Sequence, residues 1–239
     1  MTGPEPLTLY CVPHAGGSAR SFVRWRRELP AALHARPLEI AGKGLRSREP
    51  RAATLRAAAS DLALRLDPAG RYALLGHSMG GLLAYETALA LHALGRPAPE
   101  FVVVAATRPP HLLGGSSYGP LLALDDDALL DALAENGRIP REVRRSPMRH
   151  RFVPVIRGDL ALLAGHRPDR EPRPLRSDLV AWYGGDDADT PPEVMAGWRH
   201  YTRRTHVGEA FDGGHFFLHE RFDEVVARLL GLAQHRAGR

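Results

Sequence analysis

Residues 71–83 read RYALLGHSMGGLL. The apolar run that ends at Leu75 predicts a buried strand, and the apolar residues after Gly80 predict a helix. The turn between them must be very tight, and glycines at 76 and 80 avoid the clashes that side chains two residues before and after Ser78 would make. Such a strand–turn–helix elbow raises the serine hydroxyl above the carboxyl end of a sheet, beside the first N–H groups of a helix. The pattern therefore predicts that Ser78 is a nucleophile.

Strand-like and helical segments alternate along much of the chain. Short, continuously apolar runs predict strands that are buried on both faces, as in a parallel sheet. Together with the elbow, this alternation predicts the α/β-hydrolase fold, a mostly parallel central sheet with helices on both faces. The predicted strands are 7–12, 37–41, 71–76, 101–106, 178–183 and 207–211, and the predicted helices outside the region described next are 21–29, 55–66, 81–94, 192–201 and 222–234.

One long region, residues 109–176, interrupts this alternation. It contains no convincing strand pattern, whereas 125–134 and 152–164 have apolar residues at helical spacing. An insertion of this length between two strands is too long for a passive loop. We therefore expect a single α/β-hydrolase domain over residues 1–239, with a helical lid insertion at about 110–176.

Two backbone N–H groups should hold the negative oxygen that forms when a serine attacks a carbonyl group. In this fold one comes from the residue after the nucleophile, here Met79, and the other from the loop after the first strand. That loop is PHAGGS, residues 13–18, whose adjacent glycines permit a close approach of the backbone. The N–H of Ala15 is the first candidate and that of Gly16 the second. His14 lies on the wrong loop for a catalytic base, and we expect it to pack beside the oxyanion hole.

The candidate for the general base is His215, within FDGGHFFL at residues 211–218. The order serine, acid, histidine along the chain requires a late histidine on a loop. His206 and His219 are weaker candidates, because one precedes the last predicted strand and the other begins a helix. His215 and His219 have the four-residue spacing of some metal ligands, but no glutamate follows the first, so the zinc-protease pattern is absent. We predict neither a metal nor a cofactor.

The acid of a catalytic triad should follow the strand at 178–183, where the sequence reads GGDDADT. Its carboxylate would accept the Nδ1–H of the histidine, fix the tautomer and stabilise the imidazolium. Asp186, Asp187 and Asp189 all qualify, and spacing alone does not choose among them.

Composition limits the partners and the compartment. The formal net charge is +5 and Lys43 is the only lysine, so arginine carries nearly all the positive charge. Because the arginines are scattered and no recognition motif is present, we expect no nucleic-acid partner; an acidic protein partner and a merely solvated surface both fit the charge.

No apolar run reaches the roughly 18 residues of a membrane span, and the N-terminus lacks a signal-peptide pattern. With Cys11 as its single cysteine, the chain is expected to be cytoplasmic and, by default, monomeric.

These motifs together resemble the type II thioesterases, the stand-alone editing hydrolases of polyketide and nonribosomal peptide biosynthesis. The resemblance covers most of the chain and is carried by PHAGGS at 13–18 with Phe22 and Trp25, GHSMGG at 76–81, VPVIRGD at 153–159 and GGHFFL at 213–218. It implies hydrolysis of aberrant or stalled acyl groups from the phosphopantetheine arm of acyl or peptidyl carrier proteins, through an acyl-serine intermediate. Carrier proteins of this kind are usually acidic, which suits the basic chain.

The resemblance also bears on single residues. Aligning Trp198 with a family tryptophan places Asp187 on the triad acid, with Asp189 as the second choice, although Ala188 replaces the proline that often follows the acid. Lys43 stands where the family usually has an arginine, which keeps the charge but not the planar shape. Arginines crowd the predicted lid, and we expect some of them to face the carrier protein: Arg138, Arg141, Arg144, Arg145, Arg149 and Arg151.

Three alternatives have different functions or substrates. A generic small-ester carboxylesterase or lipase would use the same triad, and a comparison of thioesters with matched oxygen esters would distinguish it. A non-catalytic binding protein of the hydrolase fold is disfavoured, because serine, histidine and aspartate all occur at suitable places. A type I terminal thioesterase, which releases or cyclises a product, is usually fused to a synthase; we expect no upstream domain here, and the predicted acid follows the later strand.

Overall fold

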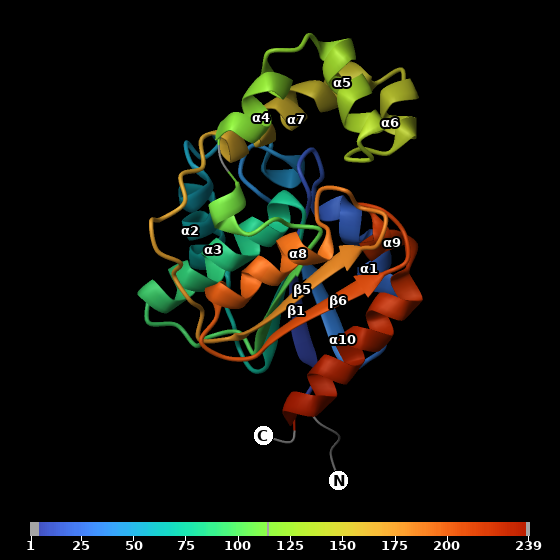
Figure 1. Cartoon of the computed structure of the whole chain (residues 1–239). Helices are drawn as coiled ribbons and strands as arrows, with labels where there is room; N and C mark the ends of the chain where they lie inside the picture. Colours follow the sequence, from blue (N-terminus) through green and yellow to red (C-terminus); the bar gives the residue numbers. More distant parts are fainter. Residues whose placement is uncertain (1–4, 114, 238–239) are drawn as a thin grey trace.

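A single six-stranded sheet forms the centre of the molecule (Figure 1). The computed structural model describes residues 5–113 and 115–237. The strand order is β2-β1-β3-β4-β5-β6, and every pair of neighbouring strands runs parallel. The strands are β1 Leu7–Val12, β2 Leu33–Pro37, β3 Tyr72–His77, β4 Phe101–Ala105, β5 Asp178–Gly184 and β6 His206–Phe211. The predicted parallel α/β sheet is confirmed.

Helices cover both faces of the sheet because alternate residues of each strand point to opposite sides. Leu74 packs with α2 and α3 in one apolar cluster, whereas its neighbour Leu75 packs with α1 and α10 in the other. Each face therefore has its own core. The helices around the sheet are α1 Val23–Glu28, α2 Leu55–Arg65, α3 Met79–Ala93, α8 Pro192–Met195, α9 Phe217–Glu220 and α10 Phe222–Ala237, with 3-10 turns at Ala19–Phe22, Gly44–Arg46, Pro110–Leu112 and Ala196–Tyr201.

The second strand was predicted in the wrong place. The sequence favoured 37–41, but β2 is Leu33–Pro37, and it lies at the edge of the sheet beside β1. Only its first residue is buried, so the strand lacks the continuous apolar run that marks the central strands. The apolar residues that suggested a strand at 37–41 include Ile40, which packs into the core from a loop.

Between β4 and β5 the chain forms a separate group of helices that lies above the carboxyl end of the sheet (Figure 1). These are α4 Gly115–Leu122, α5 Asp126–Glu135, α6 Arg141–Arg145 and α7 Arg149–Ala164, which we call the lid. The described residues of 109–176 form no strand beyond an isolated bridge at Leu175, as predicted. The predicted helices 125–134 and 152–164 correspond to α5 and α7, whereas α4 and α6 were not predicted.

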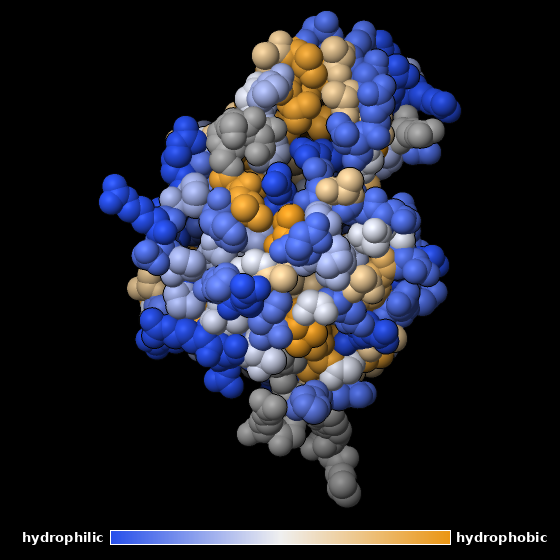
Figure 2. All heavy atoms as spheres, viewed as in Figure 1, coloured by the Kyte–Doolittle hydropathy of each residue, from blue (hydrophilic) through white to orange (hydrophobic). Residues whose placement is uncertain are grey.

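The surface is mainly hydrophilic in the view of Figure 2, with apolar residues gathered in the lid and where it meets the body below. Among the described helices, none is both long enough and apolar enough to span a bilayer. The division into one domain with a lid insertion at about 110–176 stays a prediction.

Candidate active site

The elbow places Ser78 between β3 and α3 in a strained conformation, with φ 55° and ψ −122°. Few residues other than glycine adopt a positive φ, and such strain is common at functional sites. The neighbouring glycines are required by contact: a Cβ on Gly76 would lie 1.9 Å from the carbonyl oxygen of Gly80. A Cβ on Gly80 would lie 2.2 Å from the carbonyl oxygen of Val12. Backbone therefore packs directly on backbone, as the sequence predicted.

His215 and Asp187 meet above this elbow, although 28 residues separate them. The Nδ1 of His215 lies 2.8 Å from Asp187 Oδ2, and both side chains are buried. Because a carboxylate can only accept, Nδ1 carries the proton of this bond, and Nε2 is the ring nitrogen left to act as a base. Close backbone contact brings the two loops together, since a Cβ on Gly184 would lie 2.3 Å from the carbonyl oxygen of Gly214.

Further hydrogen bonds keep the carboxylate of Asp187 ionised. Its Oδ2 accepts the hydroxyl of Thr190 at 2.8 Å, and its Oδ1 accepts the N–H of Asp189 at 3.1 Å. Burial alone would raise the pKa of Asp187, but the bonds from His215 and Thr190 outweigh it and lower the pKa. The group is therefore an anion at neutral pH, as an orienting acid requires.

The other two candidate acids lie elsewhere. Asp189 forms an ion pair with Arg138 of the lid at 2.6 Å, and Asp186 is exposed. The structure thus brings Asp187 to His215 and leaves Asp189 as a link to the lid. His206, a weaker candidate for the base, is the first residue of β6. It therefore lies at the opposite end of this strand from the loop that carries His215.

The loop after β1 contributes the other side of the site. Ala15, Ser78, Met79 and His215 line one cavity of about 50 Å³. The N–H of Gly16 donates to Asp159 Oδ2 at 2.7 Å, so this group is already engaged. Of the two candidates in the loop, Ala15 is therefore the better placed to donate to an oxyanion.

The remaining wall of this cavity is mostly apolar and comes largely from the lid. An apolar wall suits an acyl chain, and Ser78 and His215 line the same cavity. The apolar lining residues include Leu82, Leu113, Leu133, Ile139, Ile156, Leu160 and Leu163.

A buried ion pair below the lid was not predicted. Lys43 Nζ lies 2.6 Å from Asp159 Oδ2, with side-chain exposures of 1% and 0%, and Arg51 reaches Oδ1 of the same carboxylate at 3.1 Å. Burial lowers the pKa of Lys43, and the carboxylate of Asp159 opposes this effect. Asp159 therefore joins α7 of the lid to two core segments, the loop of Lys43 and the oxyanion loop at Gly16. The only lysine of the chain was the one available signal.

His77, next to the candidate nucleophile Ser78, serves as a local support. Its Nε2 lies 2.7 Å from the backbone carbonyl oxygen of His215, which fixes the position of the loop that carries the base. His14 and His219 stack near it edge to face. Burial lowers the pKa of His77, that of His14 to about 3 and that of His219 to about 4, so all three rings are neutral at pH 7.

Comparisons with known proteins agree with this geometry. The thioesterase domain family matches residues 7–231. Thioesterase PikA5 of Streptomyces venezuelae is 30% identical over 92% of this chain and 78% of its own length. Among solved structures, the RedJ thioesterase from the prodiginine pathway of Streptomyces coelicolor is 32% identical, with a TM-score of 0.84 over 95% of this chain and 91% of that one. The type II thioesterase BorB from the borrelidin biosynthetic cluster is 28% identical, with a TM-score of 0.82 over 97% and 94%.

The resemblance predicted from the sequence is thus confirmed, as is the α/β-hydrolase fold that these relatives share. The match extends from the first strand to the last helix, and it includes the elbow and the loops that carry the candidate acid and base. This chain belongs to the thioesterase family.

Proposed function

We propose that this chain is a type II thioesterase that removes aberrant or stalled acyl groups from carrier proteins, with Ser78, His215 and Asp187 as its catalytic triad. The observation that supports this most directly is the Asp187–His215 hydrogen bond of 2.8 Å, because His215 and the strained elbow residue Ser78 line the same largely apolar cavity. The pathways named for RedJ and BorB supply the substrate class.

The first half of the reaction forms an acyl-enzyme. Ser78 Oγ attacks the thioester carbonyl carbon while His215 Nε2 takes the hydroxyl proton, and Asp187 accepts the Nδ1–H and stabilises the imidazolium. The N–H groups of Ala15 and Met79 hold the oxyanion. Collapse of the tetrahedral intermediate breaks the carbon–sulfur bond, and His215 returns its proton to the leaving thiol.

The second half releases the acyl group. Water attacks the acyl-serine as His215 removes one of its protons, and the same two N–H groups hold the second oxyanion. Breaking of the ester bond returns the proton to Ser78 and releases a carboxylic acid. The sequence of steps needs no cofactor, and the apolar lid residues would hold the acyl chain in place.

We further propose that the basic face of the lid contacts the carrier protein. Among the described residues, Arg144 and Arg149 form ion pairs with Asp131 and Asp127 within the lid. Arg145 and Arg151 are exposed and have no ion pair with a described residue, so they are the better candidates for an acidic partner. The side chain of Arg141 lies outside the described residues. The cytoplasmic location and monomeric state stay predictions.

The decisive experiment compares one acyl group on two leaving groups. Wild type and Ser78→Ala would be assayed on short acyl groups loaded on a carrier protein, with the matched free oxygen ester as control. We expect faster cleavage of the carrier-bound thioester and a loss of at least about 10⁴-fold in Ser78→Ala. Turnover of the oxygen ester alone would support the carboxylesterase alternative, and substantial activity in Ser78→Ala would contradict the assignment of the nucleophile.

Two neighbouring aspartates provide a matched test of the acid. Asp187→Asn should lower kcat by about 10⁴-fold, because the amide permits the wrong tautomer of His215. Asp189→Asn removes only the charge that pairs with Arg138 and should retain most of kcat. A larger loss in Asp189→Asn than in Asp187→Asn would show that the second choice was the correct acid.

A further inference from the structure

Three histidines from distant parts of the chain converge beside the elbow, and one of them, His14, also lines the acyl cavity. His14 comes from the loop after β1, His77 ends β3, and His219 lies in α9. One ring nitrogen of each lies within 4.8 Å of one from each of the other two. The proposed reaction uses none of these rings as acid, base or nucleophile.

Each of the three rings has a buried nitrogen without a hydrogen-bond partner among the described residues: His14 Nδ1, His77 Nδ1 and His219 Nε2. An unsatisfied buried polar atom costs free energy, so three in one cluster require an explanation. Edge-to-face contact of the rings, with centroids 5.2 to 6.4 Å apart, accounts for their carbon atoms but not for these nitrogens.

His77 shows most clearly what such a nitrogen offers. Its Nε2 must donate, because the backbone carbonyl oxygen of His215 can only accept. The neutral ring of His77 therefore has a lone pair on Nδ1, and the whole side chain is buried. A histidine that binds a metal usually donates its other N–H to a backbone carbonyl or a carboxylate, and His77 already has this arrangement.

We propose that His14, His77 and His219 form a binding site for a divalent transition metal ion of the zinc class. Neutral imidazoles are good ligands for Zn²⁺ and Co²⁺, and three protein ligands leave a fourth position for water or a small ligand. In a tetrahedral zinc site the ligand nitrogens are ~3.4 Å apart, as follows from Zn–N bonds of about 2.05 Å, so nitrogens that lie within 4.8 Å of one another need to approach by at most about 1.4 Å.

A cavity beside the cluster would give an ion a route to these buried nitrogens. His14 and His219 are only partly buried, and both line a cavity of about 630 Å³ between the body of the protein and the lid. The bound ion would also stabilise the loop of the catalytic base, because His77 holds the carbonyl of His215. The proposed metal site differs from the prediction made from the sequence. There only His215 and His219 had a metal-like spacing, and no metal was predicted.

The test measures binding, not turnover, so it is independent of the proposed function. Full-length protein is stripped with a chelator and titrated with Zn²⁺ by calorimetry and with Co²⁺ by visible absorption. We expect one equivalent, a tetrahedral Co²⁺ spectrum and a higher Tm with metal. His219→Gln should weaken binding by about 100-fold or more, because loss of a mere supporting partner already costs about 10- to 100-fold. The matched control is His92→Gln, on the exposed side of α3.

Two outcomes would overturn the proposal. One is a His219→Gln variant that binds Zn²⁺ as tightly as His92→Gln. The other is loss of binding in Asp187→Asn with His219→Gln unaffected, which would place the ion on the catalytic pair. If His219→Gln does not fold, X-ray absorption of zinc-loaded wild type decides, since three imidazole ligands support the site and a carboxylate ligand contradicts it.

Discussion

The two halves of the site are held in different ways. In the body of the protein the elbow and the loops of Asp187 and His215 are fixed by backbone against backbone, with no room for a Cβ at Gly76 or Gly184. The lid reaches this half through side chains, as in the bond of Asp159 to Lys43 and that of Arg138 to Asp189. Backbone contacts set the geometry of the proposed triad, whereas side chains, both charged and apolar, set the position of the lid.

This difference implies that the lid can shift without loss of the catalytic arrangement. The exception is Asp159, which contacts both the lid-supporting Lys43 and the N–H of Gly16 in the oxyanion loop. A single carboxylate therefore couples the position of α7 to the loop that includes Ala15. We expect the loss of stability on substitution to decrease in three steps. It should be largest at the backbone contacts of the elbow, smaller at the buried carboxylate of Asp159 and smallest at exposed ion pairs.

The largest effect is expected at the elbow. In Gly76→Ala the new Cβ would meet the Gly80 carbonyl oxygen at 1.9 Å, and neither backbone segment can retreat within the core. We expect the free energy of unfolding to fall by more than about 4 kcal/mol, or the folded protein to be lost, as measured by urea denaturation. The control is Gly119→Ala in α4, where a Cβ has open space; this should be neutral or stabilise by up to ~1 kcal/mol. Equal stability of the two variants would contradict the claim that close backbone contacts fix the elbow.

The buried carboxylate of the lid should have the next largest effect. Asp159→Asn leaves Lys43 buried without a counter-charge, which costs roughly 3–5 kcal/mol in comparable buried pairs. The matched control is Asp127→Asn, which removes an exposed lid ion pair with Arg149 and should change stability by less than ~1 kcal/mol. Thermal and urea denaturation of both variants would measure the difference. A double variant, Lys43→Met with Asp159→Leu, should recover much of the stability, because it removes both charges together.

The same division explains what the sequence could predict. The four central strands and the elbow were predicted because continuous apolar runs and paired glycines reflect local requirements of the backbone. Edge strand β2 was misplaced because only its first residue is buried, whereas the other edge strand, β6, was predicted from a short strand-like segment. Helix α4 was missed because its sequence, GSSYGPLL, contains glycine and proline.

Contacts between side chains far apart in the sequence left no local pattern to interpret. Asp159 lies 116 residues after Lys43, and spacing along the chain does not indicate which charged groups meet. For the same reason the sequence could not choose among Asp186, Asp187 and Asp189. The convergence of His14, His77 and His219 depends on three separate turns of the fold. The resemblance to a family could favour Asp187, but only the folded chain brings it to His215.

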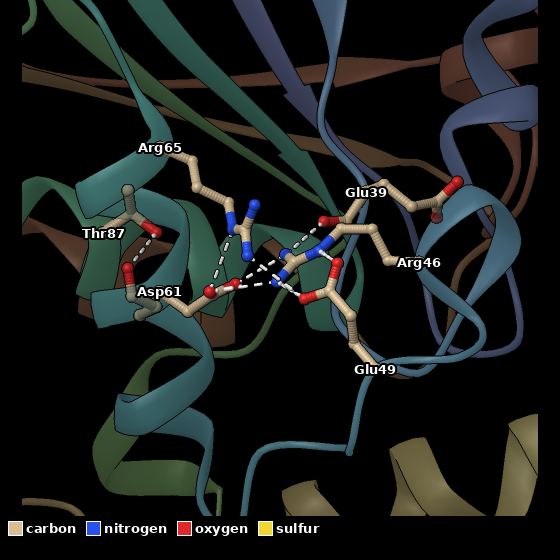
Figure 3. A network of polar contacts seen from close by, with 7 residues as sticks. Glu39, Arg46, Glu49, Asp61, Arg65 and Thr87 are labelled. Carbon is tan, nitrogen blue, oxygen red and sulfur yellow. Dashed lines mark hydrogen bonds and ion pairs between the residues drawn. The ribbon is translucent and has the colours of Figure 1, made fainter.

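The smallest effect is expected at a partly exposed network around Arg46, three residues after Lys43 (Figure 3). Arg46 bonds to Glu49 and to Asp61 of α2, both at 2.6 Å, and Arg65 bonds to the same two carboxylates. All four groups reach solvent to some degree, unlike Lys43 and Asp159. The two networks therefore hold neighbouring residues of one segment at different depths, Lys43 in the core and Arg46 nearer the surface.

Asp61→Asn should lower the free energy of unfolding by only about 0.5–1 kcal/mol at pH 7, and less at high salt. The hydrogen bond from Arg46 lowers the pKa of Asp61 below its unfolded value, so this contribution is complete above about pH 4 and is lost as the pH falls through the folded pKa. Urea denaturation of wild type and variant from about pH 7 to about pH 3 should therefore give curves that converge in acid. Asp159→Asn should stay far below wild type over most of that range. A surface variant as destabilising as Asp159→Asn would show that depth of burial does not separate the two networks.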